Sequence, residues 1–158
     1  IPEPLIQKNI SRVMSLRDGT KKMSKSDESN YSRIDLKDSA DEIIKKIKKA
    51  KSDSSSIPDD LNTLAEKPEA LNLITIYANL SGKSLDQALN EVKGKEYSYL
   101  KNKLSEVLVE VICPLGKEIN KLLQDKSFLE KALKEGTEKA RLIAERNLKE
   151  IKNVVGFF

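Results

Sequence analysis

The stretch Lys21-Lys22-Met23-Ser24-Lys25-Ser26-Asp27 decides how this chain is organised. It follows Asp18-Gly19, a dipeptide typical of a tight turn, and a short apolar run over 12–16. The sequence therefore predicts a short strand, a turn and a loop that carries lysine and serine side chains. Lysine is a compact cation on a flexible stem, and a serine hydroxyl donates hydrogen bonds. Such a loop can close over a polyphosphate and stabilise the negative charge that develops on a leaving group.

A solvated lysine and serine loop without a ligand is the alternative interpretation of the same residues. The context favours the ligand, because Lys22-Met23-Ser24-Lys25-Ser26 matches the KMSKS signature of class I aminoacyl-tRNA synthetases. The flanks resemble the tryptophanyl-tRNA synthetase family more closely than the tyrosyl enzymes, which usually carry a different version of the loop. Glu28 departs from the family, which often has proline at that place. Beyond the loop, pattern-level similarity is carried by the segments 12–16, 26–27, 31–34, 44–47, 72–74 and 80–84.

The resemblance implies roles for individual residues around the loop. Lys25 and then Lys22 are the expected catalytic residues, while Lys21 is a general electrostatic contributor. The backbone at Val13 is expected to lie against the adenine of ATP, although a plain core residue fits that position equally well. The expected ATP-binding residues are Val13, Lys22, Met23, Ser24, Lys25 and Ser26.

The implied reaction is attack of the tryptophan carboxylate on the α-phosphate of ATP, with release of pyrophosphate, and transfer of the aminoacyl group to tRNA(Trp). No general base is required, because the carboxylate is already ionised at neutral pH. Catalysis is then mostly positioning and electrostatic stabilisation. The resemblance also implies Mg²⁺ bound with ATP rather than at a protein metal site, a homodimer, a cytoplasmic location and no membrane. The residues that contact tRNA are not assigned.

The composition excludes several kinds of site within this chain. It contains no histidine, so a HIGH motif, a histidine-based triad and a histidine metal site are all absent from its 158 residues. Members of the resembled family are about twice as long, so we expect a C-terminal half. The HIGH signature and the amino-acid pocket would lie in the half that is absent, and this chain alone is expected not to aminoacylate.

Charge and hydropathy are those of a helical protein without a membrane span. The net charge of +4 and the pI of about 9.0 permit contact with nucleic acid without demanding it. No apolar run approaches the length of a transmembrane helix. The single cysteine, Cys113, cannot form an internal disulfide, and its apolar neighbours predict a buried, reduced thiol in a cytosolic protein.

Helix signals follow the loop. Ser39 and Glu42 form a capping box that predicts a helix to about Lys51, with its lysines solvated or, alternatively, on RNA phosphate. Its expected buried stripe is Ile43, Ile44, Ile47 and Ala50. A polar connector over 52–60 precedes a second helix that begins at Pro68 and ends near Gly82.

The chain from Ser84 onward also has a helical pattern. Ser84 and Gln87 form another capping box, and Gly94 ends that helix. The longest helix spans about 96–123 with a kink at Pro114, and helices over 128–135 and 137–155 follow, separated by Gly136. Of Tyr97 and Tyr99, one is expected to be core. Other expected core positions are Leu115, Leu122, Leu129, Leu133, Ala140, Ile143, Ala144, Ile151 and Val154.

The predicted fold is mainly α-helical. A bundle of about five or six helices follows one short strand and the KMSKS loop, which complete a Rossmann-type α/β catalytic domain absent from this chain. The predicted domains are 1–38, the end of the catalytic domain, and 39–158, a helical domain that binds the tRNA anticodon arm by resemblance. Three alternatives stay open: a class I synthetase for another amino acid such as tyrosine, a non-catalytic helical RNA-binding module, and a structural helical scaffold.

Overall fold

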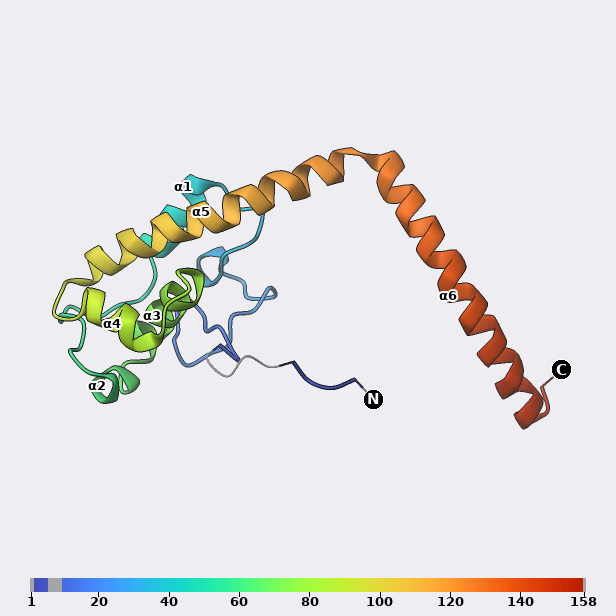
Figure 1. Cartoon of the computed structure of the whole chain (residues 1–158), viewed down its shortest axis with the longest axis horizontal. Helices are drawn as coiled ribbons and strands as arrows, with labels where there is room; N and C mark the ends of the chain where they lie inside the picture. Colours follow the sequence, from blue (N-terminus) through green and yellow to red (C-terminus); the bar gives the residue numbers. More distant parts are fainter. Residues whose placement is uncertain (1, 6–9, 158) are drawn as a thin grey trace. The chain divides into compact units, whose positions relative to one another are not determined.

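The structure is a computed structural model that describes residues 2–5 and 10–157 (Figure 1). Across those residues the fold is mainly α-helical, as the sequence predicts, with a 3-10 turn at Asn30–Ser32 before the first helix. The helices are α1 (Ala40–Lys48), α2 (Leu61–Ala65), α3 (Pro68–Leu80), α4 (Leu85–Val92), α5 (Tyr97–Gln124) and α6 (Lys126–Val155).

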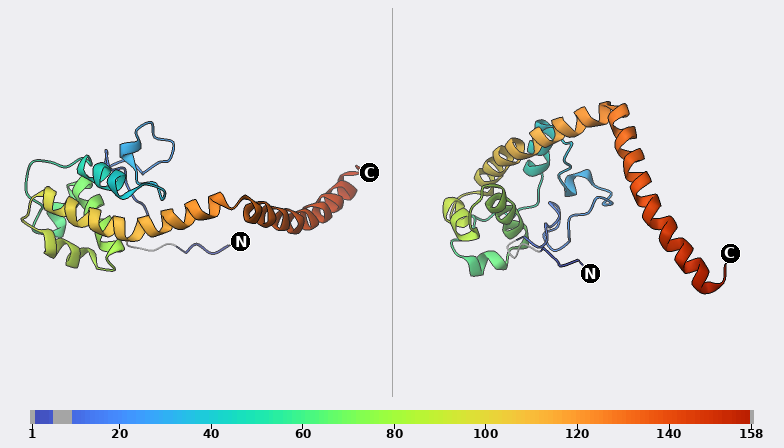
Figure 2. Two further views of the ribbon diagram at one scale, coloured as in Figure 1. Left: turned by 90° about the horizontal axis from the view of Figure 1, so that it is seen from above. Right: turned by 45° about the vertical axis from the view of Figure 1, so that its right-hand side comes forward.

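The chain divides into two compact units, Ile1–Gly116 and Lys117–Phe158. The first unit holds the hydrophobic core, to which α1, α3, α4 and the first half of α5 all contribute. Helix α3 packs against both α2 and α4 (Figure 2). Lys101 of α5 donates a hydrogen bond of 2.7 Å to the carbonyl of Ala50, which ties α5 to the end of α1.

Local capping signals place the helix ends. Ser39 and Glu42 form the predicted capping box at α1, and Ser84 and Gln87 form the one at α4. Ile43 and Ile47 of the predicted α1 stripe are fully buried. Gly82, which follows α3, has a φ of +66°, a left-handed backbone that favours glycine at a helix end.

The strand expected over 12–16 is reduced to one isolated antiparallel bridge between Met14 and Lys22. On either side of it, the amide of Ser15 donates to Lys21 O at 2.8 Å, and the amide of Met23 donates to Val13 O at 3.0 Å. The turn at Asp18-Gly19 folds the segment back on itself, so only a few residues on each side can pair. A longer strand needs further sheet neighbours, and the described residues contain none.

The predicted break at Gly136 is wrong, because α6 continues through it from Lys126 to Val155. Glycine in a helix interior costs only about 1 kcal/mol relative to alanine, and Gly136 does not adopt the left-handed backbone by which a glycine commonly ends a helix. The predicted burial is also wrong here, since none of the described residues of α6 is buried. The expected core positions that are at least half exposed are Leu115, Leu133, Ile143, Ile151 and Val154.

Two further side chains differ from the prediction. Lys46 was expected on the solvated face of α1, but it is buried, and its amine lies 2.5 Å from Asp38 Oδ2 and 3.7 Å from Asp35 Oδ2. It lies one helical turn from Ile43, on the face that meets the core. Cys113 is a free thiol, as expected, but it is only half buried at the edge of the core.

Gly19→Ala is expected to destabilise the first unit. An added Cβ would lie 2.5 Å from Glu69 N and from the carbonyl carbon of Pro68, so the backbone of α3 or of the turn would have to move. Overpacking of this kind costs about 1–3 kcal/mol. Urea unfolding followed by circular dichroism of the full-length protein measures the change.

Gly136→Ala is the matched control, because a Cβ there meets nothing within 4 Å. It lies inside α6, so alanine should stabilise the helix by about 0.5–1 kcal/mol. Equal effects of the two substitutions would contradict the close packing of Gly19 against α3.

Candidate active-site loop

The base of the loop is fixed by one buried side chain of α3, Asn72, which is 6% exposed. Its Oδ1 accepts from the amide of Met14 at 3.0 Å, and its Nδ2 donates to the carbonyl of Met14 at 2.9 Å. The same Nδ2 also donates to the carbonyl of Ser15 at 3.5 Å. Met14 is the residue that bridges to Lys22, so α3 holds the backbone opposite the first lysine of the motif.

The turn between the two arms of the loop base is also anchored. Asp18 Oδ1 accepts from the amide of Thr20 at 3.0 Å and from its hydroxyl at 2.6 Å, and these bonds lower the pKa of the Asp18 carboxyl. Gly19 packs directly on the backbone of Pro68 and Glu69, where α3 begins. The loop base is therefore held by α3 at two places.

The motif itself presents its lysines to solvent. Lys22 and Lys25 are exposed, and among the described residues neither forms an ion pair. Ser24 Oγ and Ser26 Oγ lie 3.0 Å apart, and the amide of Asp27 closes a turn onto Ser24 O at 3.4 Å. Two cations and two hydroxyls thus lie at the exposed positions 22 and 24–26, while the intervening Met23 packs against the core.

Arg33 holds the exit of the loop. Its guanidinium donates to the carbonyl of Asp27 at 3.1 Å, to Asn30 Oδ1 at 2.7 Å and to Asp35 Oδ1 at 3.3 Å. The exit also returns to the base, because the amide of Leu16 donates to the carbonyl of Ser32 at 2.9 Å. The tip of the loop is therefore confined between two fixed ends.

The structure brings together all six residues that the sequence predicts for ATP binding. Val13 and Met23 face each other across the backbone pairing, and Lys22, Ser24, Lys25 and Ser26 stand beside or beyond it. Their roles toward ATP stay predictions. Sequence reasoning missed the supporting roles of Asn72 and Arg33, and it identified Gly19 as a turn residue but not its packing on α3. For Asn72 there was a signal, a single amide among the apolar residues 70–78 of a predicted core helix.

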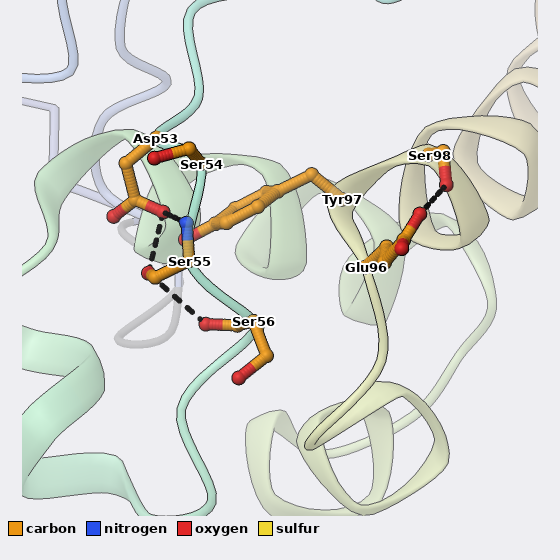
Figure 3. Close-up of a pocket in the computed structure, with 7 residues that line it drawn as sticks. All are labelled: Asp53, Ser54, Ser55, Ser56, Glu96, Tyr97 and Ser98. Carbon is orange, nitrogen blue, oxygen red and sulfur yellow. Dashed lines mark hydrogen bonds between the residues drawn. The ribbon is translucent and has the colours of Figure 1, made fainter.

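A polar hollow of about 520 Å³ has no motif residue in its lining. Figure 3 shows the residues that line it. The Tyr97 ring points from the start of α5 toward the serine-rich connector, so Tyr97 is the core tyrosine and Tyr99 is exposed. Burial, with the charges of Asp53 and Glu69, raises the pKa of Tyr97 to about 12. The residues that line the hollow are Asp53, Ser54, Ser55, Ser56, Glu96, Tyr97 and Ser98.

An apolar cavity of about 190 Å³ lies under the loop base and includes Val13, Met23, Ile34, Ile76, Leu80 and Ile112 in its lining. It offers no charge for a phosphate. Within the ranges 2–5 and 10–157, no three acidic, cysteine or histidine side chains gather as a metal site would require. No helix within residues 2–5 and 10–157 is long and apolar enough to span a membrane.

Comparisons with known proteins agree with one another. The model of a family described as tRNA synthetases class I (W and Y) matches residues 1–113. The tryptophan–tRNA ligase of Agrobacterium fabrum is 47% identical over 98% of this chain and 44% of its own length. That of Caulobacter vibrioides is 46% identical over the whole chain and 46% of its own length. The chain therefore spans less than half the length of these relatives.

The similar solved structures are also tryptophanyl-tRNA synthetases. Tryptophanyl-tRNA synthetase from Mycoplasma pneumoniae is similar with a TM-score of 0.70 and 27% identity, over 96% of this chain and 47% of that one. The enzyme from Campylobacter jejuni, complexed with ADP and tryptophan, has a TM-score of 0.70 and 25% identity, over 98% of this chain and 46% of that one.

Tyr97 is expected to ionise at a higher pH than an ordinary tyrosine side chain. Its pKa of about 12 in the folded state lies above the ordinary value of about 10, so the folded protein keeps a proton that the unfolded protein releases. The stability that neutral Tyr97 contributes is complete below about pH 10 and is lost as the pH rises toward about 12. Tyrosinate absorbance of the full-length protein minus that of Tyr97→Phe should show this late step. A difference step centred near pH 10 would contradict the burial of Tyr97.

Proposed function

The chain belongs to the class I tRNA synthetases (W and Y), and from this premise we propose that it is the KMSKS-bearing part of a tryptophan–tRNA ligase. One observation carries the proposal beyond family membership. The two motif lysines are exposed and have no carboxylate partner in the part of the chain that the structure describes, and the base and exit of their loop are both fixed. Positioned cations of this kind suit the developing charge of a pyrophosphate leaving group.

The proposed reaction is ATP-dependent activation of tryptophan, followed by transfer to tRNA(Trp). Lys22 and Lys25 bind the phosphates of ATP, with the hydroxyls of Ser24 and Ser26 beside them. Met23 keeps the loop on the core, and the half-buried backbone of Val13 is offered to the adenine. Mg²⁺ enters with ATP as substrate, so no residue of this chain is assigned to it. The likeness to a synthetase complexed with ADP and tryptophan supports this choice of ligands.

The rest of the proposal concerns the whole protein. Residues 1–38 complete the nucleotide-binding domain, and 39–158 form the helical domain that docks the tRNA anticodon arm. The tryptophan pocket belongs to the part of the protein that is absent here, and the full-length enzyme is a cytoplasmic homodimer. Tryptophan is preferred to tyrosine because the relatives at 42–47% identity are tryptophan–tRNA ligases.

Lys25→Ala in the full-length protein should abolish most of the tryptophan-dependent ATP–pyrophosphate exchange. Removing one positioned group that stabilises the charge of a transition state lowers the rate by about 10²- to 10³-fold. Affinity for tRNA should change little, because the loop acts on ATP. Lys37→Ala is the matched control, since Lys37 is another exposed lysine, outside the motif, and should leave exchange unchanged.

The same assay separates the alternatives when every amino acid is tested in turn. Exchange with another amino acid would keep the chemistry of the loop and overturn the tryptophan assignment. No exchange with any amino acid, combined with a loss of salt-sensitive RNA affinity in Lys25→Ala, would favour an RNA-binding module.

A further inference from the structure

We propose that Asn72 is a positioning residue for the adenylation reaction, which sets the place of Lys22 through the backbone of Met14. The inference rests on the proposed function and deepens it, because it assigns control of the loop to α3. Among the described residues, the Asn72 amide forms no hydrogen bond with a motif side chain. It acts on the strand segment that faces the motif.

The carboxamide of Asn72 matches the peptide group it binds. An amide side chain offers one acceptor and one donor in the same plane, and both go to Met14, at 3.0 Å to its nitrogen and 2.9 Å to its oxygen. No other uncharged side chain apart from glutamine presents this pair. Asn72 is 6% exposed, so any group that it leaves unpaired would be shielded from water.

The helix around Asn72 does not itself require asparagine. Asparagine is a poor residue for a helix interior, and its neighbours Leu73 and Ile74 are fully buried apolar side chains. The hydrogen bonds of its amide run to residues 57 or 58 positions away, not to the helix. The hydrogen bonds to the loop base therefore explain why an asparagine stands at position 72, whereas the packing of α3 does not.

The geometry makes Lys22 the lysine on which Asn72 acts. Lys22 is the direct partner of Met14 in the antiparallel bridge, with paired backbone on both sides of it. Lys25 lies three residues further, within the turn that the Asp27 amide closes on Ser24 O, and near the end that Arg33 holds. Displacement of Met14 thus moves Lys22 first.

A double-mutant cycle in the full-length protein tests the coupling. Asn72→Ala should lower kcat for tryptophan-dependent pyrophosphate exchange by about 10- to 100-fold, because a misplaced catalytic group forfeits rate on this scale. KM for tryptophan should stay unchanged. In a Lys22→Ala background the same substitution should cost less than about threefold, since residues that act as a unit are not additive.

Asn79→Ala is the matched control. Asn79 is also an asparagine of α3, but its amide donates within the helix, to Thr75 O at 2.8 Å, and it has no bond to the loop base. Its effect on exchange should be small and the same with and without Lys22→Ala. Asn72→Asp is the second variant for the cycle if Asn72→Ala does not fold. It retains the acceptor for the Met14 amide and removes the donor to the Met14 carbonyl.

The outcomes separate this inference from the proposed function. If Lys22→Ala leaves exchange intact, the proposed role of the loop fails. If Lys22→Ala impairs exchange and the Asn72 variants lower it by the same further factor, or have no effect in either background, the positioning role of Asn72 is overturned. A smaller cost of the Asn72 variants in the Lys22→Ala background, with additive behaviour of Asn79→Ala, supports it.

Discussion

The pairing of the Asn72 amide with the backbone of Met14 is the interaction on which the functional part of the molecule depends. A buried peptide group must find partners, and in a full sheet Met14 would find them in neighbouring strands. In this chain a helix side chain takes their place. The loop base therefore has a defined position even where sheet pairing is limited to a single bridge.

A second constraint is electrostatic. The loop contains acidic residues that could neutralise its own lysines, yet one oxygen of Asp18 and one of Asp27 accept from backbone amides. Asp18 Oδ1 accepts hydrogen bonds from the amide and the hydroxyl of Thr20, and Asp18 Oδ2 lies 3.5 Å from Lys21 Nζ. Asp27 Oδ1 accepts a hydrogen bond of 2.8 Å from the amide of Ser29. The charges of Lys22 and Lys25 stay available for a ligand. Among the described residues, no carboxylate is paired with Lys22 or Lys25, and both side chains are exposed.

The sequence predicted those features that depend on short-range interactions. The capping boxes at Ser39 and Ser84, the helical periods and the turn at Asp18-Gly19 join residues only a few positions apart, and the structure confirms them. The motif residues were identified by resemblance. The role of Asn72 was not predicted because its hydrogen-bond partner, Met14, lies 58 positions away in the sequence.

The incorrect predictions of burial also concern contacts that the local sequence pattern does not determine. The burial of Lys46 depends on its ion pair with Asp38. The exposure of α6 depends on whether another surface packs against its apolar face, which the sequence of α6 alone does not tell. A single sequence gives the period of a helix face but not what covers that face. The core of the first unit was predictable because its helices meet within the chain.

The separation between Met14 and Asn72 also has a consequence for how the protein reaches its native state. Closing a contact over 58 residues carries a larger entropic cost than forming a capped helix, so α1 and α3 can form before the loop base is joined to them. Partly folded molecules would then possess helices and core but no ordered loop base. Secondary structure would recover early during refolding, and the pairing of Asn72 with Met14 would recover late.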